Sequence, residues 1–401
     1  MWMGIRTVSC VNMRWAGVTA AVLAAVALSA CATIMPRVAL PLMVSQVPVV
    51  EGYDDIRARG DVVTPRVAAI IDRQYAQILA APAGTGARAR THSADFLAIS
   101  GGGSDGAFAA GYLNGWTAAG TRPAFEIVTG VSTGALAAPF AFLGKDYDRA
   151  LRRIFTQVTD KDLYTSNGPL GVIGESLLDP TPMRAFIAAE LTDEMLDRLA
   201  AEHELGRRLL IQTTDIERQI PYIWNITRIA THKTADRRRL ITDILMASAA
   251  VPGVFPPVRI NVTVDGQHIE ELHVDGGLAA QVFFAPPGLD LATFEKRHFG
   301  KHRDHRMILI RNGKMNPETN ATNPQTLPLA ARAISTLIKY QSMADIDRIK
   351  RVFARPGSHF QAVGIPETFN AKAESLFDKD YMTALYKEGY RLGLEHGRAA
   401  R

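Results

Sequence analysis

A serine between two glycines is the first candidate for chemistry in this chain. Residues 125–129 (FEIVT) predict a short strand, and the pentapeptide GVSTG at 130–134 leads into an alanine-rich segment that predicts a helix to about residue 143. Gly130 and Gly134 remove the Cβ clashes of a sharp strand-to-helix turn, so the hydroxyl of Ser132 can project from the end of a sheet above a helix N-terminus. This arrangement is typical of a nucleophilic serine.

A glycine-rich turn lies one strand-to-helix unit earlier. Residues 95–100 (DFLAIS) predict a strand, GGGSDG follows at 101–106, and residues 107–119 predict a helix. Backbone N–H groups at such a helix N-terminus can bind an anion. The glycine spacing also matches a dinucleotide fingerprint, but that site needs an acid at the end of the next strand, and Glu126 opens that strand instead. The preferred anion is therefore the oxyanion of an acyl-transfer intermediate.

The base that would activate Ser132 has two kinds of candidate. Nine histidines follow Ser132, and none has a distinctive setting; those at 298, 302 and 305 lie in a basic run that is typical of a solvated surface and lacks the acid pattern of a metal site. Asp275 follows a predicted strand at 269–274 (IEELHV) and precedes two glycines. A carboxylate at a strand end can act as a general base, although Asp-Gly pairs are also common in ordinary turns.

Four motifs, taken in order, resemble those of the patatin-like phospholipases. They are GGGxxG at 101–106, GxSxG at 130–134, ASAAVPGVFPP at 247–257 and DGG at 275–277. The resemblance implies an α/β protein with a three-layer α/β/α fold and a mostly parallel central sheet, distinct from the α/β-hydrolases. It also implies a catalytic dyad without histidine, in which Ser132 is the nucleophile and Asp275 is the base.

One residue departs from the family's pattern. Many relatives carry Arg or Lys just before the last glycine of the oxyanion turn, where this chain has Asp105. A negative charge there would oppose the charge that develops on the oxyanion unless it points away or is neutralised. The candidate donors are therefore the backbone N–H groups of the turn itself, at Gly101, Gly102, Gly103 and Ser104.

A dyad of this kind predicts ester chemistry. A carboxylate with an ordinary pKa of about 3.9 is ionised at neutral pH, so it can accept the serine proton and return it to a leaving alcohol. Amides have poorer leaving groups and suit so weak a base less well. We therefore expect a lipid acyl hydrolase that cleaves phospholipid or lysophospholipid through an acyl-enzyme. Two alternatives stay open: a general carboxylesterase with a soluble short-chain substrate, and a catalytically silent lipid-binding envelope lipoprotein.

The N-terminus has the composition of an export signal. Residues 1–30 carry Arg6 and Arg14 without an acid, and residues 15–30 are uncharged and apolar. The tetrapeptide LSAC at 28–31 resembles the bacterial lipobox, which implies a signal peptide over 1–30 and acylation of Cys31. A retained membrane helix over 15–35 is the alternative. In either case we expect an exported protein of the bacterial cell envelope, tethered to a membrane.

The remaining chain predicts a tether followed by one catalytic domain. Residues 31–94 predict a tether and accessory segment with a helix at 67–79, and residues 95–401 predict the catalytic domain, with its motifs in 95–285. Within that domain, residues 183–201 predict one helix and residues 306–311 the last central strand. Helices at about 327–353 and 380–398 are expected to cover the sheet. The segment 165–182 predicts either a lid or acyl-chain wall or an ordinary loop.

The composition excludes several other classes of protein. The 401 residues include 45 Lys and Arg against 40 Asp and Glu, and the formal charge of +5 is too small to indicate nucleic-acid binding. Two cysteines exclude a disulfide-dense scaffold and a four-cysteine zinc site. The expected partner is membrane lipid, and no cofactor, metal or nucleic acid is implied.

Overall fold

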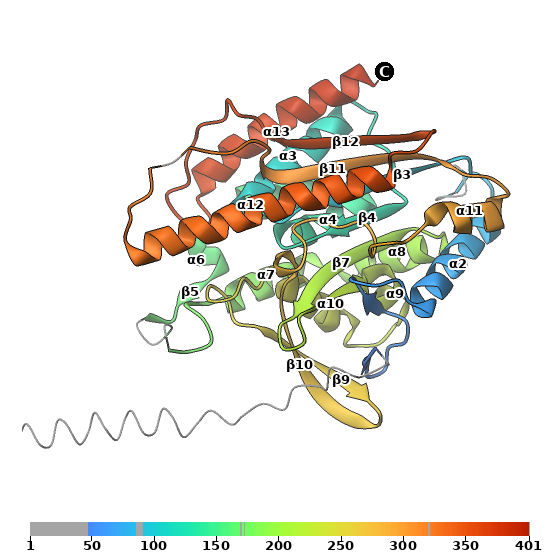
Figure 1. Cartoon of the computed structure of the whole chain (residues 1–401), viewed down its shortest axis with the longest axis horizontal. Helices are drawn as coiled ribbons and strands as arrows, with labels where there is room; N and C mark the ends of the chain where they lie inside the picture. The colour runs from blue at the N-terminus through green and yellow to red at the C-terminus, as the bar shows by residue number, and fades with distance from the viewer. Residues whose placement is uncertain (1–46, 86–90, 169–170, 172, 320, 401) are drawn as a thin grey trace, which may run out of the picture. The chain divides into compact units, whose positions relative to one another are not determined.

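The computed structural model describes residues 47–400 apart from 86–90, 169–170, 172 and 320, and one ten-stranded mixed sheet runs through them (Figure 1). The predicted signal peptide, Cys31 and the beginning of the predicted tether lie outside the described residues. The strands are β1 (Val49–Val50), β2 (Arg57–Arg59), β3 (Ser93–Ile99), β4 (Ile127–Gly130), β7 (Arg208–Asp215), β8 (Ile220–Asn225), β9 (Val258–Val264), β10 (Gln267–Asp275), β11 (Asp304–Lys314) and β12 (Ser358–Ile365), with β5 (Thr165–Ser166) and β6 (Leu178–Asp179) in a separate pair. The helices are α2 (Pro65–Ala80), α3 (Gly106–Ala118), α4 (Thr133–Leu143), α5 (Asp148–Thr156), α6 (Asp160–Leu163), α7 (Thr181–Glu190), α8 (Asp193–Glu204), α9 (Ile226–Thr231), α10 (Arg237–Ser248), α11 (Leu291–Phe299), α12 (Thr326–Val352) and α13 (Lys379–Ala399).

The centre of the sheet is parallel and its flank is antiparallel. The strands β12, β11, β3, β4 and β7 lie side by side in parallel, and β10, β9 and β1 continue the order with antiparallel pairing. On its other edge β7 pairs antiparallel with β8, which in turn pairs with β2. The apolar run of β3 is buried from Ala94 to Ile99, which is expected of a parallel strand covered on both faces.

Helices cover both faces of the central strands, which gives the three-layer α/β/α arrangement that the sequence predicts (Figure 1). Alternate residues of β3 point to opposite faces. Leu97 and Ile99 pack in the larger apolar core with residues of α3, α4, α5 and α13. Phe96 and Ala98 pack in a second core with Ile346 of α12 on the opposite face.

Two glycine-lined helices form the closest helix pair of one outer layer. Glycines recur every fourth residue in α3 (Gly111, Gly115) and in α13 (Gly389, Gly393, Gly397). A Cβ at Gly111 would overlap the carbonyl oxygen of Tyr386, and one at Gly393 would overlap that of Tyr112. The two helices therefore meet backbone to backbone, which fixes α3 and the glycine turn at its N-terminus.

One of the expected elements needs correction. The helix predicted at 183–201 is two helices, because Thr192 caps α8 by accepting the N–H of Met195 at 3.2 Å, with Asp193 and Glu194 in the first turn. The strand predicted to be the last central one is β11, and β12 follows it as an edge strand that pairs parallel to it. The helix predicted at 67–79 is α2, and β1 and β2 from the segment before it join the main sheet. None of the helices that the structure describes is long and apolar enough to cross a bilayer.

Candidate active site

Ser132 lies in the turn between β4 and α4, in a backbone conformation that residues other than glycine rarely adopt. Its φ is 55° and its ψ is −126°, and β4 ends at Gly130 while α4 begins at Thr133. Strained non-glycine residues of this kind are concentrated at functional sites. The turn is a strand-to-helix elbow, as the sequence predicts.

Gly130 and Gly134 are required by close backbone contacts around that elbow. A Cβ at Gly130 would lie 2.5 Å from the carbonyl oxygen of Gly134. A Cβ at Gly134 would lie 2.6 Å from the carbonyl oxygen of Ser100, at the end of β3. Any side chain at either position would push the elbow away from the neighbouring strand.

The elbow is also held from α10 by a serine whose role the sequence analysis missed. The N–H of Ser132 donates to Oγ of Ser248 at 2.9 Å, and that hydroxyl donates to the carbonyl oxygen of Gln212 at 2.7 Å. Ser248 is fully buried. It belongs to the ASAAVPGVFPP segment, so the motif was visible in the sequence although this contact was not.

Asp275 reaches the elbow because two strands meet end to end along one edge of β7. Since β8 occupies the other edge, β4 and β10 must share this one: Gly130 pairs with Ile211 in parallel, and Asp275 pairs with Thr213 in antiparallel. The carboxyl ends of β4 and β10 therefore face each other, with only Gln212 of β7 between the two pairing positions. The sequence around Asp275 indicates a strand end, but it carries no signal that this strand runs in the opposite direction to β4.

The carboxyl group of Asp275 is buried, and only one of its two oxygens accepts a hydrogen bond of good geometry from a described residue. Its Oδ1 accepts the N–H of Gly277 at 2.6 Å, whereas none of the described residues forms a hydrogen bond of good geometry with the buried Oδ2. Burial raises the pKa of Asp275 to about 6, and hydrogen bonding from Ser132 and Gly277 opposes that rise. The Ser132 hydroxyl therefore lies close enough to act on the carboxylate. Hydrogen bonds between catalytic groups are often long or poorly aligned before a substrate binds.

The glycine turn after β3 presents free N–H groups beside Ser132. A Cβ at Gly101 would lie 3.1 Å from Cβ of Ser132, which shows how closely the turn and the elbow approach. In the described structure the N–H groups of Gly102, Gly103 and Ser104 donate to no protein acceptor. The N–H of Gly101, by contrast, donates to the carbonyl oxygen of Gln281 at 3.1 Å. The expected set of donors is therefore corrected to Gly102, Gly103 and Ser104, because Gly101 is already engaged.

Residues 97–286 match the family model of patatin-like phospholipases. This segment is a patatin-like phospholipase domain. This match identifies the chain as a lipid acyl hydrolase. The matched segment includes the elbow, the glycine turn and Asp275. Among solved structures, VipD from Legionella pneumophila is similar at 12% identity and a TM-score of 0.43, over 77% of this chain and 67% of that one. A comparison with curated proteins found no match.

A residue beyond the matched patatin-like segment holds the glycine turn in place. Asn312, in β11, donates from Nδ2 to the carbonyl oxygen of Ser100 at 2.8 Å and accepts the N–H of Ala109 at 3.2 Å. Its own N–H donates to Oγ of Ser100 at 2.9 Å. A Cβ at Gly102 would overlap the carbonyl oxygen of Asn312, so the turn rests directly on this residue.

Asp105, the departure from the family's pattern, is bound by a tyrosine of α13. The hydroxyl of Tyr381 donates to Oδ1 of Asp105 at 2.5 Å. Burial raises the pKa of Asp105 to about 6, against the lowering effect of the Tyr381 bond. The carboxyl group is therefore engaged by Tyr381 and is charged less readily than a free aspartate, which weakens the expected opposition to an oxyanion.

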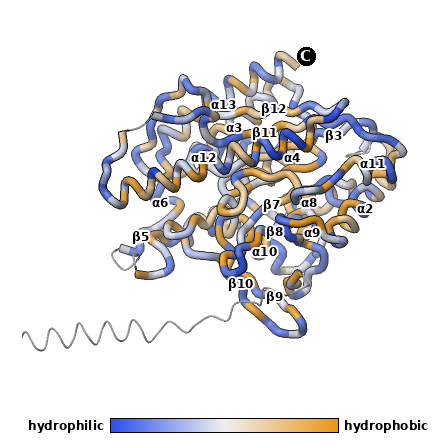
Figure 2. The backbone as a smooth tube through the Cα atoms, in the orientation of Figure 1, coloured by the Kyte–Doolittle hydropathy of each residue, from blue (hydrophilic) through white to orange (hydrophobic). Residues whose placement is uncertain are grey.

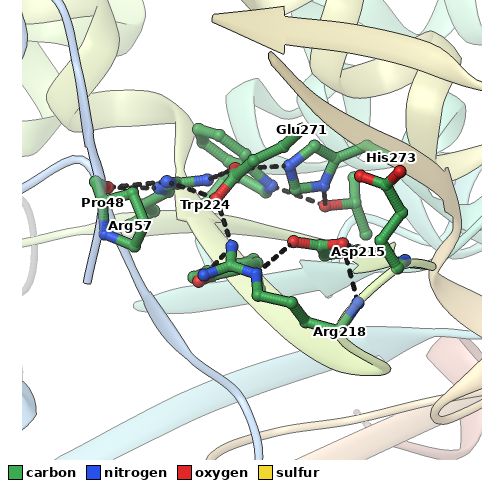
Figure 3. A network of polar contacts seen from close by, with 10 residues as sticks. Pro48, Arg57, Asp215, Arg218, Trp224, Glu271 and His273 are labelled. Carbon is green, nitrogen blue, oxygen red and sulfur yellow. Dashed lines mark hydrogen bonds and ion pairs between the residues drawn. The ribbon is translucent and has the colours of Figure 1, made fainter. Parts of the chain in front are cut away.

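Histidine 273, two residues before Asp275, is part of a buried network of polar side chains (Figure 3). Its Nε2 lies 2.9 Å from Oε2 of Glu271, and its Nδ1 lies 2.9 Å from Oγ1 of Thr213. Arg57 donates to Glu271 at 2.5 Å, and Arg218 donates to the same carboxylate. Burial alone would raise the pKa of Glu271, but Arg57 and the His273 bond outweigh it and lower the pKa to about 2. His273 therefore packs within the patatin-like domain as a structural residue.

Other polar residues weighed from the sequence also have structural partners. Glu126 receives two bonds from the buried guanidinium of Arg303, at 3.0 and 2.5 Å, at the end of β4 away from Ser132. The solvated surface expected for the three histidines holds for His302, which is exposed, whereas His298 and His305 are partly buried and bond to Asp72 at 2.8 Å and Glu295 at 2.7 Å. The described residues include no group of three or more side chains that could hold a metal ion.

Proposed function

We propose that this enzyme hydrolyses acyl esters of phospholipid or lysophospholipid with Ser132 as nucleophile and Asp275 as base. The observation that carries the proposal is the end-to-end meeting of β4 and β10, which brings the Ser132 elbow to a buried carboxylate with an unpartnered oxygen. Among the described residues, no histidine hydrogen-bonds to Ser132 or to Asp275.

In the acylation step, Oδ2 of Asp275 accepts the proton of Ser132 as Oγ attacks the ester carbonyl carbon. The negative charge that develops on the carbonyl oxygen is stabilised by the N–H groups of Gly102, Gly103 and Ser104. Asp275 then returns the proton to the leaving alcohol, which leaves the acyl chain on Ser132.

In the deacylation step, Asp275 takes a proton from water, and the resulting hydroxide attacks the acyl-enzyme. The free fatty acid leaves, and the proton returns to Oγ of Ser132. A pKa of about 6 keeps Asp275 ionised at neutral pH yet makes it a stronger base than an ordinary aspartate.

The first half of α12 favours a lipid surface over a soluble ester. Leu327 is 81% exposed and Leu337 is 70% exposed, and apolar residues recur along this part of the helix (Figure 2). Residues 326–341 contain no acid, so this stretch carries no negative charge that would oppose an anionic lipid surface. Nε2 of Gln341 donates to the carbonyl oxygen of Leu278 at 3.3 Å, so this helix lies beside the turn that carries Asp275.

We also propose that the chain is exported and anchored to a membrane of the cell envelope through acylated Cys31. The support is the apolar segment 15–30 followed by LSAC at 28–31. An anchor would hold the enzyme near its insoluble substrate and raise the local substrate concentration. Incorporation of labelled palmitate, lost in Cys31→Ala, tests this proposal.

The catalytic proposal is tested by labelling the full chain with a fluorophosphonate and assaying phosphatidylcholine vesicles. Ser132→Ala should abolish both labelling and hydrolysis, and Asp275→Asn should lower kcat by about 10³-fold because the general base is lost. Asp265→Asn is the matched control, since Asp265 also precedes a glycine but lies in the exposed turn between β9 and β10. It should leave the activity unchanged.

The same assay separates the alternatives. Labelling with hydrolysis of short-chain esters but not of phospholipid would identify a general carboxylesterase. A folded wild-type chain that is neither labelled nor active, but that binds vesicles, would identify a silent lipid-binding protein.

A further inference from the structure

A cavity of about 820 Å³ adjoins the oxyanion turn. It begins at Gly102 and Asp105, follows the end of β11 from Arg311 to Lys314, and is closed by the first half of α12 and residues 365–372. Most of this wall lies outside residues 97–286, so the family match does not describe it.

Arg311 is a buried cation in that wall, and no carboxylate among the described residues forms an ion pair with it. It is 7% exposed, and its Nε donates to Oγ of Ser342 at 2.8 Å. Its Nη1 is buried and has no hydrogen-bond partner in the described structure. Asp105 and Glu318 act on it electrostatically, but neither forms an ion pair with it.

Most buried arginines that the structure describes are neutralised by carboxylates, and Arg208, which is not, donates to two backbone carbonyl oxygens and to Gln77. Arg57 and Arg218 pair with Glu271, and Arg303 pairs with Glu126. A buried charge without such compensation is costly to the folded protein. The lack of a carboxylate partner at Arg311 is therefore what we expect of a cation that binds an anionic ligand.

The charges around the cavity favour an anion. The nearby acids are engaged: Asp105 accepts from Tyr381, and Glu318 pairs with Lys339 at 3.3 Å. The third acid of the wall, Glu367, accepts the N–H of Asn316 at 3.3 Å. Three further basic side chains line the same space, namely Lys314, Arg332 and Lys372.

The cavity reaches the oxyanion turn at Gly102, which lines it together with Arg311 and Asn312. Asn312 supports the oxyanion turn at Gly102, and Arg311 precedes Asn312 in β11. A ligand whose ester carbonyl binds at the turn can therefore place an anionic group at Arg311. A phospholipid has this form, because the glycerol backbone joins its acyl esters to a phosphodiester.

We propose that Arg311 binds the phosphate of the lipid substrate in this cavity and thereby gives the enzyme a preference for phospholipid over neutral lipid. The planar guanidinium suits a phosphodiester, to which it can donate two parallel hydrogen bonds. This inference rests on the proposed function, since it assigns the head-group side of the same site.

The test compares two substrates with the same acyl chains, one with a phosphocholine group and one without it. Wild type, Arg311→Gln and Arg311→Lys are assayed in mixed micelles of phosphatidylcholine and of diacylglycerol with the same acyl chains. Arg311→Gln should lower kcat/KM for phosphatidylcholine by about tenfold to a hundredfold, leave diacylglycerol hydrolysis unchanged, and be partly rescued by Arg311→Lys. Arg355→Gln is the control for loss of one positive charge, because Arg355 lies in an exposed pair with Asp290. An equal loss on both substrates would overturn the proposal.

A binding measurement keeps the inference separate from catalysis. An ether-linked phosphatidylcholine, which cannot be hydrolysed, is titrated into the Ser132→Ala chain with and without Arg311→Gln, and inorganic phosphate is titrated in parallel. Lipid binding weakened tenfold or more by Arg311→Gln supports the subsite even if no ester is hydrolysed, in which case only the proposed function fails. Binding of inorganic phosphate at Arg311 without any effect of Arg311→Gln on lipid binding would identify a free-phosphate site and overturn the proposal. Lipid binding that is unchanged by Arg311→Gln, with no phosphate bound, would also overturn it.

Discussion

At the scale of single residues, the catalytic proposal depends on a buried carboxylate whose charged form is destabilised by its surroundings. Asp275 is 4% exposed, and one of its oxygens lacks a partner. Its pKa is raised from 3.8 to about 6, so the folded protein holds a proton on this group more tightly than the unfolded chain does. The stability that this proton contributes is present at low pH and is lost as the pH rises through about 6.

Replacement of this carboxylate should therefore separate stability from activity. At pH 8, Asp275→Asn should be more stable than wild type by up to about 3 kcal/mol, since one pKa unit corresponds to about 1.4 kcal/mol. Below about pH 3 the difference should vanish, because the wild-type group is then protonated in both the folded and the unfolded state. Urea unfolding at the two pH values measures this, and a variant that is less stable than wild type at pH 8 would contradict it.

The same group sets the pH dependence of the reaction. Only the ionised form of Asp275 can accept the Ser132 proton, so kcat/KM on an uncharged ester should rise with pH through about 6 in the wild-type enzyme. Asp105 and Asp345 also have pKa values raised to about 6 by burial, which affects stability in the same range. A profile that is flat between pH 5 and 8 would exclude Asp275 as the base.

At the scale of elements, the position of the oxyanion turn depends on how closely α13 packs against α3. The turn leads directly into α3, and α3 contacts α13 through glycines on both helices. An alanine at Gly393 would have the better intrinsic helix propensity, yet its Cβ would overlap the backbone of Tyr112.

Gly393→Ala should therefore destabilise the protein by about 3 kcal/mol and lower the activity, because the overlap with backbone cannot be relieved by a change of rotamer. Thermal unfolding and ester hydrolysis measure the two effects. Lys387→Ala, on the exposed side of α13, is the control and should change neither. A Gly393→Ala variant as stable as wild type would show that the helices can separate without cost.

At the scale of the whole molecule, the site depends on chain segments on both sides of the patatin-like domain. Asn312 and Tyr381 come from the part that follows it, and Arg57 from the part that precedes it. Arg57 donates to the carbonyl oxygen of Pro48 at 2.6 Å and to Glu271 of β10 at 2.5 Å. This pair connects the N-terminal segment to the strand that carries Asp275.

Arg57→Met should destabilise the protein by about 3 to 5 kcal/mol, because it removes one of the buried cations that compensate Glu271. Arg59→Met is the matched control two residues away, since Arg59 forms a partly exposed pair with Asp61, and it should change stability by less than about 1 kcal/mol. Denaturant unfolding of both variants measures the difference. Equal effects would show that the buried network does not stabilise the sheet.

The sequence by itself determined the local parts of this protein. Both strand–glycine–helix units, the elbow at Ser132 and the Asp-Gly-Gly turn are encoded by neighbouring residues, since glycines and short apolar runs restrict the backbone over a few positions. The break at Thr192 was also readable, as a capping threonine followed by two acids, although it was overlooked. Such signals need no knowledge of what lies across the sheet.

Only the tertiary structure decided how those parts are completed. It showed that β10 runs toward β4, that Gly101 is engaged by Gln281, that Asp105 is bound by Tyr381, and that Arg311 is left without a carboxylate. Each of these depends on a partner far away in the chain, which packing selects and which short-range propensity does not encode. The physical reason is that burial and hydrogen-bond satisfaction are properties of the whole packed structure, whereas turn geometry is a property of a few residues.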